Sequence, residues 1–251
     1  MAKEYISLQG KFYLSKLTNG IAGAMRHVGN VPDFELEIGA DVIEHQESTS
    51  GNRTTDFTMV NTTSVNFSGT LEEVNKENLE YIVSGTNTEV ASSTVTDESL
   101  GTVVANDEIQ LKGYNLSQVT FKDSTSATPV TVDPSQYTLD SKFGTVIFHD
   151  VADLTMPILA SYTTGAVTHT TLANNFNEEY ELFFKGINTA NNKHMAVRLW
   201  RTKKSPETTF PLIHEELGQY EISGQALSEI GKESDPTLGL YGHIVTIPAA
   251  V

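Results

Sequence analysis

The sequence contains no cysteine. Without thiols the chain can form neither disulfide bonds nor a thiolate metal site. It also lacks any run of about 18 apolar residues, so no segment is expected to cross a membrane as a helix. The opening residues, MAKEYISLQGKFYLSK, have no apolar core of the kind found in signal peptides. These absences favour a protein that is made and folded in a cytoplasm.

Basic residues are scarce. The chain has 16 Lys and Arg residues against 32 Asp and Glu residues, a net charge of −16, and the acidic excess is spread along the whole length. Such a surface repels the phosphate backbone of nucleic acids, so tight DNA binding is not expected. Solubility alone would also explain this charge.

Hydrophobic residues make up only 38% of the chain, whereas Thr, Ser, Asn and Gly are plentiful. This balance suits short strands and polar turns. In DFELEIG, Phe34, Leu36 and Ile38 alternate with acidic residues, which is typical of a half-buried strand. The sequence therefore predicts a mainly β protein, with further alternating segments at 64–69, 177–188, 194–200, 209–218, 219–226 and 241–248.

One segment, TLEEVNKENLEYIVSG, has helical spacing instead. Thr70 followed by Glu73 resembles a capping box, and Gly85 can close a helix in the left-handed conformation. This pattern predicts one capped α-helix over residues 71–84. Its apolar face is interpreted as core packing and consists of Leu71, Val74, Leu79, Ile82 and Val83.

Two polar stretches, at 86–101 and 163–175, bracket a middle block of short strand candidates. We predict an inserted small β-domain at 91–171 within a framework formed by 1–90 plus 172–251. The alternative is that the middle strands join the main sheet. The candidates lie at 108–113, 117–123, 135–140, 144–150 and 157–163.

No motif in the sequence predicts catalysis, a cofactor or a metal site. The seven histidines lack metalloprotease spacing, and no nucleophile elbow, dinucleotide fingerprint or calcium loop occurs. Glu44-His45 and His214-Glu215-Glu216 are poor joint ligands, because adjacent strand residues point to opposite faces. We therefore do not predict an enzyme, although a site assembled from distant residues stays open.

Three segments in order resemble a known family. They are the opening KFYLSKLTNGIAGAMRHVGNVPDFELEIGADVIEHQESTSGNRTTDFT, the helix containing Glu77-Asn78-Leu79, and VRLWRTKKSPETTFPLIHEELGQYEISGQALSE. Together they resemble the major tail tube proteins of long-tailed, siphophage-type bacteriophages. The resemblance covers roughly residues 10–90 and 176–247, and the middle block is a departure from the simplest family members.

The resemblance implies a structural virion protein with a tail-tube β-sandwich or barrel. Its subunits would form six-membered rings, close a continuous β-barrel around a lumen and stack head to tail in the virion tail, assembled in the host cytoplasm. The partners would be further copies of the chain, tape measure protein and DNA in the lumen, and tail terminator and distal tail proteins at the ends. The inserted domain is expected to face outward.

The resemblance also assigns roles to particular residues. The long loop at 41–56 would reach the next ring through Glu44, His45, Glu47, Ser48, Gly51, Arg53 and Asp56. Negative charge in a lumen would keep DNA mobile, so Asp33, Glu35 and Glu37 are candidates for lining it. An ordinary solvent face is the other interpretation of these three acids.

Two alternatives remain open at the level of the sequence. One is another ring or tube component, such as a tail terminator. The other is a cell-surface carbohydrate-binding β-sandwich module, which would display aromatic clusters on loops. The chain has a single tryptophan, Trp200, and it falls inside a predicted strand.

Overall fold

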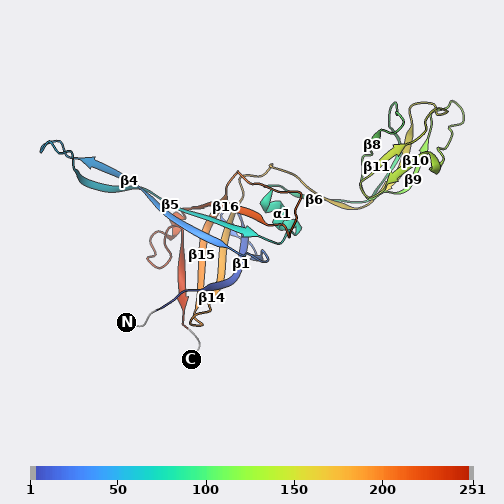
Figure 1. The fold of residues 1–251 in the computed structure, drawn as a ribbon. Helices are drawn as coiled ribbons and strands as arrows, with labels where there is room; N and C mark the ends of the chain where they lie inside the picture. Colours follow the sequence, from blue (N-terminus) through green and yellow to red (C-terminus); the bar gives the residue numbers. More distant parts are fainter. Residues whose placement is uncertain (1–3, 249–251) are drawn as a thin grey trace. The chain divides into compact units, whose positions relative to one another are not determined.

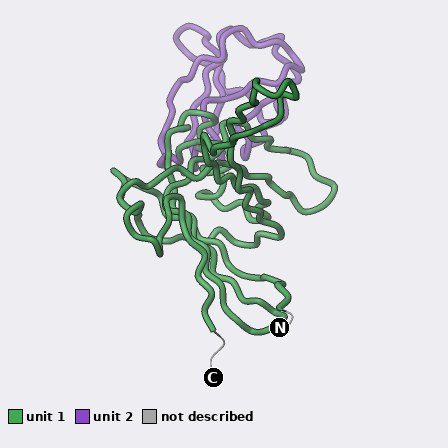
Figure 2. The backbone as a smooth tube through the Cα atoms, turned by 90° about the vertical axis from the view of Figure 1, so that its left-hand side faces the viewer, with its two compact units in different colours: residues 1–86, 170–251 green, residues 87–169 purple. Residues whose placement is uncertain are grey.

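The computed structural model describes residues 4–248. The chain divides into two compact units, one formed by 1–86 with 170–251 and the other by 87–169 (Figure 2). Strands dominate, and α1 is the one α-helix among the described residues, so the predicted mainly β fold is confirmed. None of the helices within 4–248 is long and apolar enough to span a bilayer.

The first unit is built on one antiparallel sheet of nine strands (Figure 1). The order is β2-β1-β14-β15-β16-β5-β4, while β17 pairs with β15 and β3 pairs with β1. The bounds are β1 Leu8–Thr18, β2 Ile21–Ala22, β3 Arg26–His27, β4 Phe34–Gln46, β5 Thr55–Leu71, β14 Glu179–Asn188, β15 His194–Lys204, β16 Tyr220–Leu227 and β17 Gly242–Ile247, with a 3₁₀ turn at Ile230–Lys232.

Along the edge away from β14, strand β15 pairs with two different strands in turn. Residues 194–199 pair with β17, and residues 201–204 pair with β16. The strands β16, β5 and β4 can therefore turn away from the rest of the sheet and fold back over it. The Phe34 ring of β4 consequently lies against the Phe12 ring of β1, with centroids 4.3 Å apart. The sheet thus supplies both layers of a sandwich.

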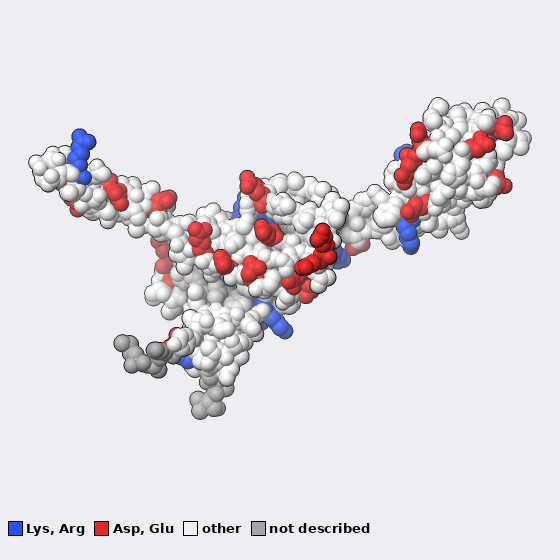
Figure 3. Space-filling model, viewed as in Figure 1, with Lys and Arg blue, Asp and Glu red and all other residues white. Residues whose placement is uncertain are grey.

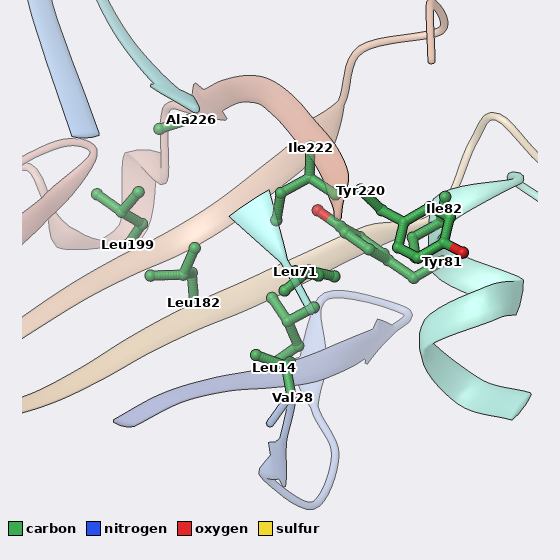
Figure 4. Close-up of a cluster of buried hydrophobic side chains, with 10 residues drawn as sticks. All are labelled: Leu14, Val28, Leu71, Tyr81, Ile82, Leu182, Leu199, Tyr220, Ile222 and Ala226. Atoms are coloured by element: carbon green, nitrogen blue, oxygen red, sulfur yellow. The ribbon is translucent and has the colours of Figure 1, made fainter. Parts of the chain in front are cut away.

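The buried core between these layers draws on β1, β5, α1, β14, β15 and β16 and on Val28 after β3 (Figure 4). Fully burying a large aliphatic side chain stabilises a fold by about 1.5–3 kcal/mol. Leu71 at the end of β5 and Ile82 in α1 are both essentially inaccessible to solvent, so they tie the helix to the sheet. The buried members are Leu14, Val28, Leu71, Tyr81, Ile82, Leu182, Leu199, Tyr220, Ile222 and Ala226.

The predicted helix at 71–84 begins too early. Helix α1 spans Lys76–Ile82, and its N-cap is Asn75, whose side chain accepts from the Asn78 N–H. The predicted capping box is wrong because Thr70 belongs to β5 and donates its N–H to the Asp33 carbonyl. Strand pairing extends to Leu71 opposite Tyr220, so sheet formation overrides the local helical pattern.

Other parts of the predicted helix also differ. Val74 precedes α1 and is exposed, and Leu71 is buried as a strand residue. The left-handed position after the helix is Ser84, with φ of 49°, rather than Gly85. Gly85 has a different role, because an added Cβ would lie 2.0 Å from the Thr171 carbonyl oxygen. The glycine therefore permits close approach of the chain rather than a positive φ.

The alternating segment 209–218 is not a strand. No strand lies between Lys204 and Tyr220, although the pattern TFPLIHEELG predicted one. Pro206 and Pro211 lack the N–H groups that a ladder requires, and Leu212, Ile213 and Leu217 have no layer to cover them. Residues 205–219 instead form a long connection between β15 and β16.

The second unit has two three-stranded sheets, β10-β11-β8 and β7-β12-β9, around a core of its own. Phe121, Phe148 and Tyr162 are among its largest buried side chains. The bounds are β7 Ser93–Ser99, β8 Glu108–Gln110, β9 Ser117–Lys122, β10 Tyr137–Asp140, β11 Thr145–Phe148 and β12 Leu159–Thr164, with a 3₁₀ turn at Pro134–Gln136. These strands pair with one another and not with the nine-stranded sheet.

Two strands join the units. β6 (Asn87–Val90) carries the chain into the second unit, β13 (Val167–Thr170) carries it out, and the two pair as a separate ribbon. Thr86 and Thr171 also exchange hydrogen bonds, from Thr86 N–H to Thr171 Oγ1 at 2.9 Å and from Thr171 N–H to the Thr86 carbonyl at 3.1 Å. The residues at which the chain leaves and re-enters the first unit are therefore adjacent.

This adjacency leads to a prediction about excision. Replacing residues 87–169 by a short Gly/Ser bridge is expected to leave the first unit folded, because its sheet and core use no strand of the second unit. Calorimetry should show one cooperative transition, and self-association should persist. Loss of cooperative melting in the excised protein would show that the first unit depends on the second.

Candidate assembly surfaces

The hairpin of β4 and β5 continues beyond the core of the first unit (Figure 1). We call residues 40–63 the arm. Its strands pair from Ala40 opposite Thr63 to Gln46 opposite Thr55. Along the arm only Glu47 is even half-buried, and all other side chains are exposed. Main-chain pairing, rather than a core, therefore holds this segment in a hairpin.

Half of the predicted loop at 41–56 is strand. Only residues 47–54 form the turn, while β4 continues to Gln46 and β5 begins at Thr55. Strand alternation is missing because neither face of the arm packs on the core. The extended conformation is instead favoured by the β-branched residues of both strands, among them Val42, Ile43, Thr58 and Val60.

The turn is organised by Glu47. Its carboxylate accepts from the N–H groups of Thr49 at 2.8 Å and Ser50 at 2.9 Å, and from both hydroxyls of these residues. Donation from Ser50 and Thr49 lowers the pKa of Glu47 to about 2. Gly51 and Arg53 take positive φ values of 81° and 50°, which bring the chain back. The end of the arm therefore has a defined shape.

The structure distributes the predicted inter-ring residues along this arm. Glu44 and His45 lie on β4 and Asp56 lies on β5, with His45 Nδ1 2.6 Å from Asp56 Oδ1. Ser48 lies in the turn with Glu47, Gly51 and Arg53. Arg53 is the sole Lys or Arg between residues 34 and 71, and Figure 3 shows a basic side chain near the end of the arm.

Sequence reasoning missed the apolar character of the arm. Five large apolar side chains are 47–58% exposed there: Val42, Ile43, Phe57, Met59 and Val60. Ile43 lies opposite Met59 on one face, and Val42 lies opposite Val60 on the other. An isolated hairpin is marginal in water, and this one presents apolar surface on both sides. The adjacent pairs Val42-Ile43 and Met59-Val60 were the available signal.

Of the three acidic residues predicted to line a lumen, Glu35 and Glu37 lie on the solvent-exposed face of β4, and Asp33 lies just before the strand. Phe34 and Leu36 pack on the core, so Glu35 and Glu37 point outward, opposite Ser68 and Asn66. Asp33 precedes the strand and is exposed. The predicted alternation therefore holds for Phe34 and Leu36, whereas Ile38, predicted on the same buried face, is 78% exposed because the core ends before it.

Further side chains complete this outer face. A shallow depression brings Asp33 and Glu35 together with Glu207 and Glu221. Glu37 lines a neighbouring depression with Lys203 and Lys204. Burial lowers the pKa of Lys204 to about 8, and its ammonium donates to the Ile82 carbonyl at the end of α1. Figure 3 shows acidic side chains outnumbering basic ones on the visible face of each unit.

Within residues 4–248, no group of three or more His, Asp and Glu side chains is arranged to hold a metal ion. The features that stand out are instead surfaces: an arm with uncovered apolar faces and a strand face rich in carboxylates.

A family profile matches residues 5–245, which is nearly the whole chain. The chain belongs to this family. Its description is "protein of unknown function UCP028589". The match runs through both units, so membership includes the second unit as well as the nine-stranded sheet. A search of curated proteins finds no match.

Proposed function

We propose that this protein is a structural subunit that assembles with copies of itself into stacked rings, which form the tail tube of a long-tailed bacteriophage. The observation that carries the proposal is the arm. Its strands leave the core with apolar side chains on both faces, and one copy of the chain leaves these side chains exposed. Burial against neighbouring copies would remove that apolar surface from water.

The sheet supports the same proposal. Strand β4 lies at one end of the strand order, and β1 with its short partners β2 and β3 lies at the other. Unpaired strand edges are templates for pairing with another chain. Joining such sheets side by side in a ring closes them into a barrel and removes the edges. Rings that stack through different surfaces grow as a filament.

The acidic residues on the solvent-exposed face of β4 are consistent with the lining of a tube. Glu35 and Glu37 on β4 would line the lumen, where tape measure protein and then DNA pass without tight binding. Tail terminator and distal tail proteins would close the ends. The protein would then reside in the virion tail, after assembly in the host cytoplasm, with the second unit outside the tube.

Negative-stain microscopy of the purified protein tests the proposal directly. Rings or tubes are expected, and their growth should depend on protein concentration because each contact joins two copies. Isolated globules at every concentration, salt and temperature would refute the proposal and favour a binding module.

Charge reversal tests the lumen assignment. The pair Glu35→Lys and Glu37→Lys is expected to assemble normally but to make the tubes retain duplex DNA, because new cations release phosphate counterions. Co-sedimentation at several salt concentrations would measure this retention. Asp107→Lys with Asp153→Lys makes the same charge change on exposed sites of the second unit. Equal DNA retention by both variants would contradict a lumenal position for Glu35 and Glu37.

A further inference from the structure

The connection between β15 and β16 carries the most exposed large apolar side chains of the described chain. Leu212 is 83% exposed, Ile213 93% and Leu217 92%. We call residues 205–219 the hook loop. Two carboxylates, Glu215 and Glu216, lie between these apolar residues and are also exposed. Its surface is thus both apolar and acidic.

The hook loop is held in place on the first unit. The Phe210 ring stacks on Tyr220 with centroids 4.9 Å apart, and the His214 ring meets Tyr220 edge-on at 5.7 Å. Leu212 and Ile213 lie between these two attachments. The fold therefore presents them to solvent from a fixed position, which is unfavourable unless something covers them.

The first unit also has a groove that is lined mainly by apolar side chains. It is lined by β1, the start of β4, β14, β15 and β17, and its floor includes Phe12, Phe34, Phe184, Met195 and Val197. Among the described lining residues the single charged one is Lys11, and none is acidic. The chain has twice as many acidic as basic residues, so a groove without acids is unusual in it. The apolar lining and the positive charge of Lys11 are complementary to a segment that is apolar and acidic.

The hook loop and the groove are separate surfaces of the first unit, since no residue of 205–219 lines the groove. Met195 and Val197 belong to the first residues of β15, whereas the hook loop follows its last residue, Lys204. The last residue of the loop comes near the rim of the groove, because the Glu72 carboxylate accepts from both Gln219 and the groove residue Asn30. Leu212, Ile213 and Leu217 nevertheless stay 83–93% exposed and do not line the groove, so they leave the groove of their own chain unfilled.

We propose that the hook loop of one copy inserts Leu212, Ile213 and Leu217 into this groove on a second copy, with Glu215 and Glu216 beside Lys11. The inference rests on the proposed self-assembly and names a contact distinct from the arm. Since the two surfaces differ, the contact is head to tail and propagates from copy to copy.

The absence of natural cysteines makes the contact testable by disulfide trapping. One variant carries Ile213→Cys, and a second, with a tag of different size, carries Ile244→Cys at the groove. Mixed and oxidised under assembly conditions, they are expected to form the mixed disulfide. Ile21→Cys replaces the groove cysteine in the control, since Ile21 is 73% exposed and lies outside the groove. Equal trapping by groove and control cysteines would overturn the proposal.

Self-association supplies a second readout. Ile213→Asp is expected to weaken it about tenfold or more, whereas Ile230→Asp, at a 75% exposed site elsewhere, should not. Lys11→Glu should also weaken it, and mixing that variant with Glu216→Lys should restore part of the loss. If native protein assembles and Ile213→Asp assembles equally well, only the hook contact is refuted. If native protein never self-associates, the proposed function fails with it.

Discussion

Replacing residues 41–62 by an Asn-Gly turn is expected to leave the first unit folded and to stop assembly at single rings. Ala40 and Thr63 are directly opposite, so a two-residue turn can close the shortened hairpin in register. The removed segment contributes no residue to the buried core. It does contain all five exposed apolar side chains of the arm, whose burial on a neighbour would drive stacking.

Sedimentation velocity and microscopy would measure this outcome, with thermal melting of the same sample as the folding control. An unchanged cooperative melt with rings but no tubes is the expected combination. Tubes of ordinary length from the truncated chain would remove the arm from ring stacking and assign that role to another surface.

Arg53 allows a finer test of the same arm. Arg53→Glu is expected to slow tube growth, because the guanidinium suits paired carboxylates on an acidic neighbour. Arg53→Lys keeps the charge and loses the planar fork, so it should fall between native and Arg53→Glu. Identical growth rates for all three proteins would show that this position does not contact the adjoining ring.

Asn78→Leu should lower the free energy of unfolding of the first unit by about 3 kcal/mol. Asn78 is fully buried in α1 and donates to the carbonyls of Val28 and Glu73, each at 2.7 Å. Its side-chain oxygen accepts from Arg26, a guanidinium whose pKa burial lowers. Leucine would leave the buried Val28 carbonyl, the Glu73 carbonyl and the half-buried Arg26 cation without this partner, which costs more than the lost bonds alone.

Calorimetry would report this loss as a fall of about 6–12 °C in the melting temperature of the first unit. Asn75→Ala is the matched control, since it removes only the cap of the same helix and should cost about 1 kcal/mol. If the two variants melt alike, Asn78 acts through helix capping and not through its links to Val28 and Arg26.

Where one strand face meets the core, the sequence was sufficient to predict the fold. Phe34 and Leu36 alternate with Glu35 and Glu37 because β4 has an apolar layer beneath it and water above it. Beyond Leu36 that layer ends, so alternation no longer marks the strand, and residues 41–56 of the arm were predicted as a loop. The start of the helix was predicted wrongly for a related reason. Leu71 belongs to a strand because it pairs with Tyr220, a residue far away in the sequence.

The candidate surfaces were predictable only in part. The resemblance pointed to the charged and polar residues of the arm, but it did not predict their arrangement across two strands. The hook loop was missed because Phe210, Leu212 and His214 alternate with other residues as strand residues would. Only the tertiary contacts with Tyr220 show that this alternation anchors an exposed loop.

The paired strands β6 and β13 bear on how such a chain changes over evolution. A domain that enters and leaves through adjacent strands can be gained, lost or exchanged in one recombination event, since the flanking segments already meet at Thr86 and Thr171. The second unit is therefore a natural place for foreign sequences, and a peptide or small domain grafted between β6 and β13 would be displayed once on every subunit.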